Sequence, residues 1–256
     1  MFIGIGTPIP EIANLPGTSR PGSGGGGGIA IDLIDNNYSL KCDSAANSSI
    51  NTNIGEIEGF QDTTMSFSCW FNIPVSPGGN IYSYFPVWYS LKSPDLYGGP
   101  TLLMRVYGAS PGDFRITLWS YAAATGGSKV YLYSAPLYFN TWYHAVTVFT
   151  GMNVLGGSRN KIEVYLDGDT TPAIVSYNNF APDGYGSSLT NPVIGGKYSS
   201  FLNAGAYIDE WAYWANTGLS PAIIETIYNC TNDNPGKTAD LSTMSTPPTA
   251  WYRMGD

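Results

Sequence analysis

The fold class is decided by residues 161–168, which read Lys-Ile-Glu-Val-Tyr-Leu-Asp-Gly. In this stretch the apolar side chains of Ile162, Val164 and Leu166 alternate with polar or aromatic neighbours. A period of two is typical of a β-strand that buries one face. Asp167-Gly168 then supplies the positive φ angles that a tight hairpin turn requires. The stretch therefore predicts a strand that ends in a hairpin.

Similar short strands, separated by clusters of Gly, Pro, Asn and Asp, follow one another from residue 29 onward. Strands are predicted at residues 66–73, 101–107, 115–119, 129–134, 142–149 and 161–166. The run at 142–149 is apolar on both faces, which indicates a central strand covered on both sides. Many short strands at this spacing predict an all-β fold, either an antiparallel β-sandwich or a barrel.

One short helix is predicted late in the chain. Ser220 is a good N-cap residue, and Pro221 suits the first helical position. An apolar face at helical spacing follows, formed by Ile223, Ile224, Ile227 and Tyr228.

The composition excludes several classes of partner. Only 12% of the 256 residues are charged, about half of the usual share of roughly 25%. The net charge of −8 opposes binding to nucleic acid, and no Lys/Arg run supports an electrostatic membrane contact. No apolar run approaches the roughly 20 residues of a membrane-spanning helix. Residues 1–6 are apolar but have no basic region before them, so a signal peptide is not predicted.

The three cysteines, Cys42, Cys69 and Cys230, are odd in number and widely spaced. They form neither a disulfide framework nor a zinc pattern, although a single disulfide stays open as an alternative. Cys69 alternates with Phe67 and Phe71, so it is expected to be a buried apolar residue.

Residues 1–28 differ from the rest and are predicted to form an N-terminal arm and linker, with residues 29–256 as the sandwich. Four prolines between residues 8 and 21 are expected to break any regular element. Gly24 to Gly28 form a flexible linker. The arm is either a disordered tail or a segment that a neighbouring subunit holds in place, because it cannot offset its own ordering entropy. Fully extended, it can reach roughly 90–100 Å.

Six motifs, in the same order, resemble the laminin-G-like and concanavalin A-like jelly-roll family. They lie at residues 37–43, 65–71, 141–146, 164–168, 194–196 together with 207–211, and 219–221. The resemblance implies an antiparallel β-sandwich with one closing helix. The ending Trp-Tyr-Arg-Met-Gly-Asp at residues 251–256, with the Pro-rich and then Gly-rich start, resembles laminin-G-like proteins of marine tailed phages.

The resemblance also implies calcium as a cofactor, with Asp43 and Asp209 as the ligands that the family pattern favours. Carboxylate oxygens suit this hard cation. The alternative is that both residues are turn-forming or solvent-facing aspartates. The family pattern gives Asp209-Glu210 a structural role.

Catalytic groups are not predicted. The Glu-x-Asp-x-x-Glu motif of related glucanases is absent from the sequence. Asp209 and Glu210 are adjacent in a strand, so they are expected to point to opposite faces and not to act as a pair. His144 is the only histidine. It lies in an apolar strand, which favours a packed, hydrogen-bonded side chain over a catalytic base.

A cluster of aromatic residues is expected in a long segment between strands, where binding residues often gather. It comprises Tyr82, Tyr84, Phe85, Trp88, Tyr89 and Tyr97. These side chains are candidates for sugar stacking, for a protein interface, or for covering the edge of the sandwich.

We therefore expect a non-enzymatic structural or decoration protein of a phage particle, displayed on the surface of its capsid or tail. Residues 1–28 would anchor it to other virion proteins or to copies of itself. The alternative is an extracellular module that binds host-surface carbohydrate. A glycan-cleaving enzyme is a third hypothesis.

Overall fold

The structure is a computed structural model. It describes residues 7–8, 31–36, 38–41, 49–55, 57, 62–73, 83–90, 101–108, 115–121, 130–133, 137–138, 140–151, 154–156, 160–178, 192–195, 207–234 and 236–254. In the strands at 7–8, 83–90, 101–108, 115–121 and 130–133, only the backbone is described.

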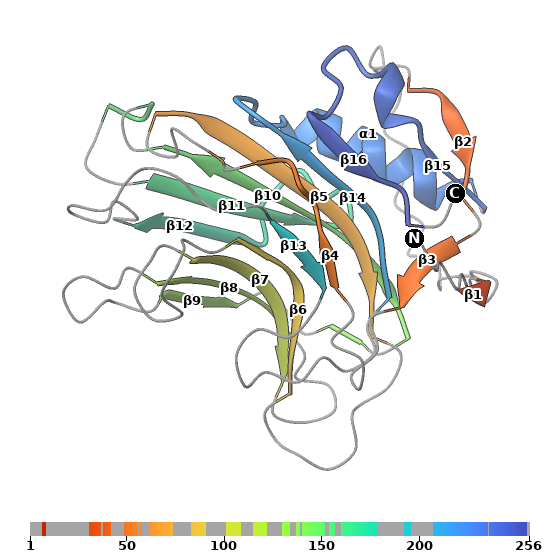
Figure 1. The fold of residues 1–256 in the computed structure, drawn as a ribbon. Coiled ribbons are helices and arrows are strands. Elements are labelled where there is room, and N and C mark those ends of the chain that lie inside the picture. The colour runs from red at the N-terminus through yellow and green to blue at the C-terminus, as the bar shows by residue number, and fades with distance from the viewer. Residues whose placement is uncertain are drawn as a thin grey trace.

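Two antiparallel sheets form a sandwich (Figure 1). The larger sheet has the order β1 (Thr7–Pro8), β3 (Tyr38–Lys41), β14 (Tyr207–Trp214), β5 (Thr64–Asn72), β10 (Trp142–Thr150), β11 (Asn160–Leu166) and β12 (Ile174–Asn178), with β16 (Ala250–Tyr252) paired to β14. The smaller sheet has the order β4 (Ser49–Asn51), β13 (Val193–Gly195), β6 (Ser83–Ser90), β7 (Thr101–Gly108), β8 (Arg115–Tyr121) and β9 (Val130–Tyr133). The all-β sandwich predicted from the sequence is thus confirmed.

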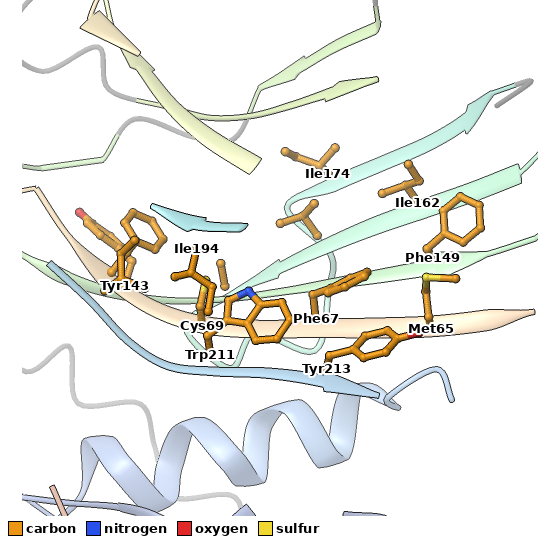
Figure 2. Packing of buried hydrophobic residues seen from close by; sticks show 14 of the residues in the cluster. Met65, Phe67, Cys69, Tyr143, Phe149, Ile162, Ile174, Ile194, Trp211 and Tyr213 are labelled. Atoms are coloured by element: carbon orange, nitrogen blue, oxygen red, sulfur yellow. The ribbon is translucent and has the colours of Figure 1, made fainter. Parts of the chain in front are cut away.

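The hydrophobic core lies between the two sheets (Figure 2). Alternate residues of β5, including Met65, Phe67 and Phe71, point into it and are fully buried. Trp211 of β14 lies beside Phe67, with ring centroids 6.1 Å apart. Burial of these large rings supplies most of the driving force for bringing the sheets together.

A third layer covers the outer face of the larger sheet, on the side away from the core (Figures 1 and 2). It contains the helix α1 (Pro221–Asn232), the short 3-10 helix η1 (Leu241–Thr243), and the pair β15 (Lys237–Ala239) and β2 (Leu33–Asp35). Ile224 and Ile227 of α1 are buried in a second apolar cluster with Val146, Val148 and Trp214 of the sheet. β10 is covered on both faces, as its apolar residues on both faces predicted, and its polar residues His144 and Thr147 are buried with them.

Several local predictions are confirmed. The predicted strands at 66–73, 101–107, 115–119, 129–134, 142–149 and 161–166 correspond to β5, β7, β8, β9, β10 and β11. Asp167 and Gly168 have φ angles of 50° and 69°, as the hairpin requires. Ser220 caps α1 by accepting from the backbone N–H of Ile223. Cys69 is a free and fully buried thiol, and Cys230 is also free.

Two predictions about backbone structure are wrong. Residues 83–90 form the strand β6, with a bulge between Pro86 and Trp88, and are not a loop. In the arm, Thr7–Pro8 form a short strand at the edge of the larger sheet, a position at which proline is tolerated in β-sheets. Within the described residues, no helix is long and apolar enough to cross a membrane.

Candidate functional site

A row of polar and aromatic residues crosses four strands at one end of the outer face of the larger sheet. The register places Lys41 of β3 opposite Tyr207 of β14, Tyr207 opposite Asn72 of β5, and Asn72 opposite Trp142 of β10. Cross-strand neighbours of this kind lie about 5 Å apart and share one face of a sheet. We call these four residues the rim row.

The two aromatic residues of the rim row lie on either side of an unsatisfied amide. Trp142 and Tyr207 are partly exposed, and their ring centroids are 6.4 Å apart at an interplanar angle of 49°. Asn72 lies between the two strands that carry them and is 8% exposed. Its buried Oδ1 accepts no hydrogen bond. A buried acceptor without a donor costs about 1–3 kcal/mol, so a hydroxyl that entered between the rings would gain a favourable contact.

Helix α1 covers the row of residues next to the rim row. In that row Trp70 and His144 stack with Tyr228 of the helix, at centroid distances of 5.6 and 6.2 Å. Tyr228 also packs directly over Gly168, where an added Cβ would lie 2.7 Å from the tyrosine Cβ. The close contact with this glycine fixes the position of Tyr228 on the sheet.

His144 lies beneath this aromatic stack and has no access to solvent. The side chain is 1% exposed, and its Nε2 lies 2.8 Å from the hydroxyl of Ser68. Burial lowers the pKa of His144 to about 3, so the ring is neutral at physiological pH. The prediction of a packed, hydrogen-bonded histidine is confirmed, and the Ser68–His144 pair is sealed from any substrate.

Asp167 lies beside the same histidine in the β11–β12 hairpin. Its Oδ1 accepts a 2.8 Å hydrogen bond from the backbone N–H of His144. Burial raises the pKa of Asp167 to about 6, and this hydrogen bond opposes the rise. The Asp167 carboxylate therefore holds the backbone near the start of β10 through a hydrogen bond. Its charged form is poorly solvated, which opposes ionisation.

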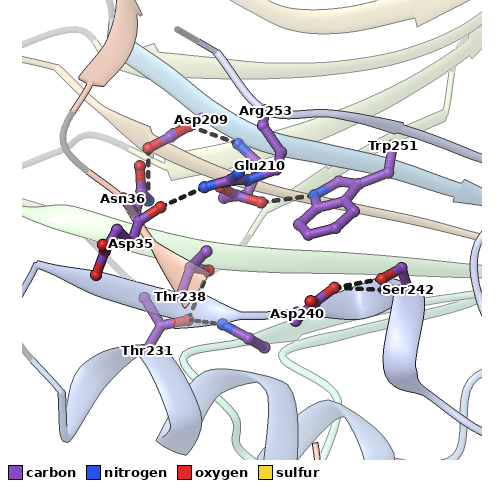
Figure 3. Close-up of polar contacts among 11 residues, drawn as sticks. Asp35, Asn36, Asp209, Glu210, Thr231, Thr238, Asp240, Ser242, Trp251 and Arg253 are labelled. Atoms are coloured by element: carbon purple, nitrogen blue, oxygen red, sulfur yellow. Dashed lines mark hydrogen bonds and ion pairs between the residues drawn. The ribbon is translucent and has the colours of Figure 1, made fainter. Parts of the chain in front are cut away.

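The expected arrangement of Asp209 and Glu210 is wrong because β14 contains a β-bulge. The register with β5 shifts between Asp209 and Ala212, and Glu210 has a φ of 49°. A bulge inserts an extra residue and lets two adjacent side chains share a face. Both carboxylates accordingly lie in the outer layer and are 3% exposed (Figure 3).

Both carboxylates join the terminal segments of the chain to the sheet. Asp209 accepts from the Asn36 side chain at 3.0 Å and from the Glu210 N–H at 2.8 Å. Glu210 accepts a 2.6 Å hydrogen bond from the Trp251 indole, and Arg253 Nε lies 3.6 Å from it. Arg253 also donates to the backbone carbonyl of Asp35, next to Asn36 (Figure 3). These contacts explain why Trp and Arg occur together in the closing strand.

The calcium hypothesis stays a prediction. Asp209 is neither solvent-facing nor in a turn, because both of its oxygens accept hydrogen bonds in a buried cluster. The other predicted ligand, Asp43, lies outside the described residues. Among the residues that the structure describes, no group of three or more His, Cys, Asp or Glu side chains is placed to hold a metal. The described donor set therefore does not form a calcium site by itself.

The predicted aromatic cluster is only partly placed. Tyr84, Phe85, Trp88 and Tyr89 belong to β6, while Tyr82 and Tyr97 lie outside the described residues. The rim row was not predicted from the sequence, because its members are separated by up to 166 positions. The one available signal was the sequence Trp142-Tyr143-His144, whose alternation puts Trp142 and His144 on the same face of β10.

Comparison with known proteins gives distant structural similarity. No protein-family model matches the chain, and no curated protein matches it. Similar solved structures include the binding domain of Paraclostridial Mosquitocidal Protein 1, at 14% identity and a TM-score of 0.49, covering 78% of this chain and 45% of that chain. Another is the botulinum neurotoxin type G receptor binding domain, at 12% identity and a TM-score of 0.45, which covers 77% of this chain and 44% of that chain. A third is Trypanosoma rangeli sialidase in complex with sialic acid, at 17% identity and a TM-score of 0.42, which covers 66% of this chain and 23% of that chain.

The chain spans less than half the length of each of these structures. The assignment of an all-β sandwich rests on the strands and sheets of the chain itself.

Proposed function

We propose that the chain is a non-catalytic, lectin-like module that binds carbohydrate at the rim row. The observation that carries this proposal is the pair of partly exposed rings, Trp142 and Tyr207, flanking the unsatisfied acceptor of Asn72. Binding sites for small ligands combine aromatic walls with a few polar groups that fix orientation. A sugar offers the matching surfaces, with an apolar ring face for stacking and hydroxyl groups as donors.

The contacts of the ionisable groups support a non-enzymatic role. His144 is sealed beneath Tyr228, and the carboxylates of Asp209 and Glu210 hold other parts of the chain in place. A general acid or base must come within hydrogen-bond reach of a substrate. Release of reducing ends from a polysaccharide by the purified protein would contradict the non-enzymatic role. It would leave the proposed carbohydrate binding unaffected.

A glycan array tests the binding proposal. We expect the wild-type protein to bind at least one glycan, and Trp142→Ala and Tyr207→Ala each to reduce that binding at least tenfold. Tyr177→Ala is a matched control, since Tyr177 is 55% exposed on the outer face of the same sheet at its far end, and its removal should leave binding unchanged. Thermal unfolding of each variant separates loss of binding from loss of fold. Absence of binding to every glycan would overturn the proposal.

A second function, as a structural or decoration protein on the surface of a virus particle, is favoured by one observation in the arm. Thr7–Pro8 pair with β3 and so extend the larger sheet by one strand. A strand added at a sheet edge is a common way for one chain to attach to another. We therefore propose that residues 1–28 attach the sandwich to other virion proteins or to copies of itself.

Deletion of residues 1–28 tests this second function. The truncated protein should retain the unfolding temperature of the sandwich and lose its incorporation into particles or its self-assembly. Full retention of assembly by the truncated protein would refute it, and it would do so without bearing on carbohydrate binding.

A further inference from the structure

The rim row ends in a cation, Lys41, that forms no ion pair with the residues that the structure describes. Lys41 is exposed and lies opposite Tyr207 in the register of β3 and β14. Other described cations are paired: Lys161 contacts Glu163 at 2.8 Å, and Lys237 contacts Asp35 at 2.9 Å. Arg253 lies beside Glu210 in the buried cluster. An exposed cation at the end of the rim row, next to Tyr207, favours an anionic group at that point against the overall net charge of −8.

We infer that the rim row binds an acidic saccharide, whose carboxylate or sulfate group contacts Lys41. This inference rests on the proposed carbohydrate binding and adds the class of sugar. Trp142 and Tyr207 stack against the apolar faces of the rings, and a sugar hydroxyl donates to Asn72 Oδ1. Four neighbouring strands span about 14 Å, which is the length of a short oligosaccharide lying across the sheet.

Two described carboxylates of β14 near the rim row are already paired within the chain. Asp209 lies in the next row, two residues from Tyr207 along β14, and is 3% exposed. Its oxygens accept hydrogen bonds from Asn36 and from the backbone of Glu210. Glu210 contacts Arg253 (Figure 3). The side chain of Lys41, by contrast, is exposed.

Asn72 Oδ1 is buried, so neighbouring side chains must move before a sugar hydroxyl can reach it. The tilted contact between Trp142 and Tyr207 at 6.4 Å is a modest interaction, worth about 0.5–1.5 kcal/mol beyond burial. A hydrogen bond to the Asn72 acceptor offsets the cost of separating the two rings.

The test compares wild type with Lys41→Gln on an array that holds sialylated, uronic-acid and sulfated glycans together with their neutral counterparts. The glutamine removes the charge and keeps an unbranched polar side chain, although one shorter than lysine. We expect the bound glycans to be acidic. Lys41→Gln should weaken their binding about two- to fivefold, as an exposed ion pair allows, and leave neutral counterparts unaffected. Methyl esterification of the best acidic ligand should reproduce the effect on the wild-type protein.

The possible outcomes separate the two proposals. If only neutral glycans bind, or if Lys41→Gln binds the acidic ones as tightly as wild type, the acidic specificity is wrong and carbohydrate binding stands. If no glycan binds, both are wrong. A salt titration adds a second readout: raising NaCl from 50 to 500 mM should weaken binding of the acidic ligand to wild type more than to Lys41→Gln.

Discussion

The stability of the protein at acid pH depends on His144 and Asp167, which are neighbours with opposite pKa shifts. The pKa of His144 is lowered from 6.5 to about 3 by burial. In the unfolded chain His144 is protonated below about pH 6.5, whereas in the folded protein it stays neutral down to about pH 3. The free energy of unfolding therefore falls as the pH drops from 6.5 toward 3. Over the whole range this amounts to about 5 kcal/mol.

Asp167 acts in the other direction. Its pKa is raised from 3.8 to about 6 by burial, so the folded protein takes up a proton near pH 6 that the unfolded chain accepts only near pH 4. Stability due to this group rises as the pH falls from 6 to 4, by about 3 kcal/mol. Between pH 6 and pH 4 the loss of stability due to His144 and the gain due to Asp167 nearly cancel. Below pH 4 only the loss due to His144 remains.

Two single variants separate the two groups. His144→Gln keeps a hydrogen-bonding group for Ser68 and removes the titration. The stability of wild type relative to this variant should fall by about 3 kcal/mol between pH 6.5 and pH 4. With Asp167→Asn, the stability of wild type relative to the variant should rise by a similar amount between pH 6 and pH 4. The other carboxylates titrate in the same way in wild type and variant. Their contributions to the free energy of unfolding therefore cancel in each difference.

Guanidinium chloride unfolding, followed by tryptophan fluorescence at pH 4, 5, 6 and 7, measures these differences. A difference between wild type and His144→Gln that stays constant with pH would refute the burial of a neutral histidine. A constant difference for Asp167→Asn would show instead that the Asp167 carboxylate is well solvated.

Three further predictions concern single positions. Gly168→Ala should lower the unfolding temperature, because Gly168 has a positive φ and its new Cβ would meet the Cβ and ring of Tyr228. In a Tyr228→Gly background the clash is absent, so Gly168→Ala should there cost only the backbone term of about 1–2 kcal/mol. Alkylation followed by mass spectrometry should label the partly exposed Cys230 under native conditions and spare Cys69, whose pKa is raised by complete burial. If calcium binds at Asp209, millimolar Ca²⁺ should raise the unfolding temperature of wild type and not of Asp209→Asn; equal curves with and without Ca²⁺ would reject that site.

The strands could be predicted from the sequence where one face of a sheet is more buried than the other. In such strands apolar and polar residues alternate, because successive side chains point to opposite faces. The runs that became β5 and β11 are of this kind. The aromatic residues from Tyr82 to Tyr97 are predicted to lie in a long segment between strands, whereas residues 83–90 form the strand β6. The bulge between Pro86 and Trp88 accommodates the proline within the strand, and such a bulge leaves little trace in sequence periodicity.

The candidate site could not be predicted from the sequence, for a related reason. Lys41, Asn72, Trp142 and Tyr207 come together only through the registers of three strand pairs, and register depends on long-range pairing. The same limit applies to Glu210. Alternation placed it opposite Asp209, whereas its positive φ and the extra residue in β14 turn it toward Trp251.

The two groups of polar residues on the outer face have separate roles, and one depends on the other. Asp209 and Glu210 fasten the segments around Asn36 and Arg253 to β14, and these segments belong to the layer that includes α1. In that layer Tyr228 stacks with Trp70 and His144, the row next to Trp142 and Tyr207. The buried carboxylates therefore hold in place the layer that covers the neighbouring row of the sheet, while Trp142 and Tyr207 stay partly exposed beside it.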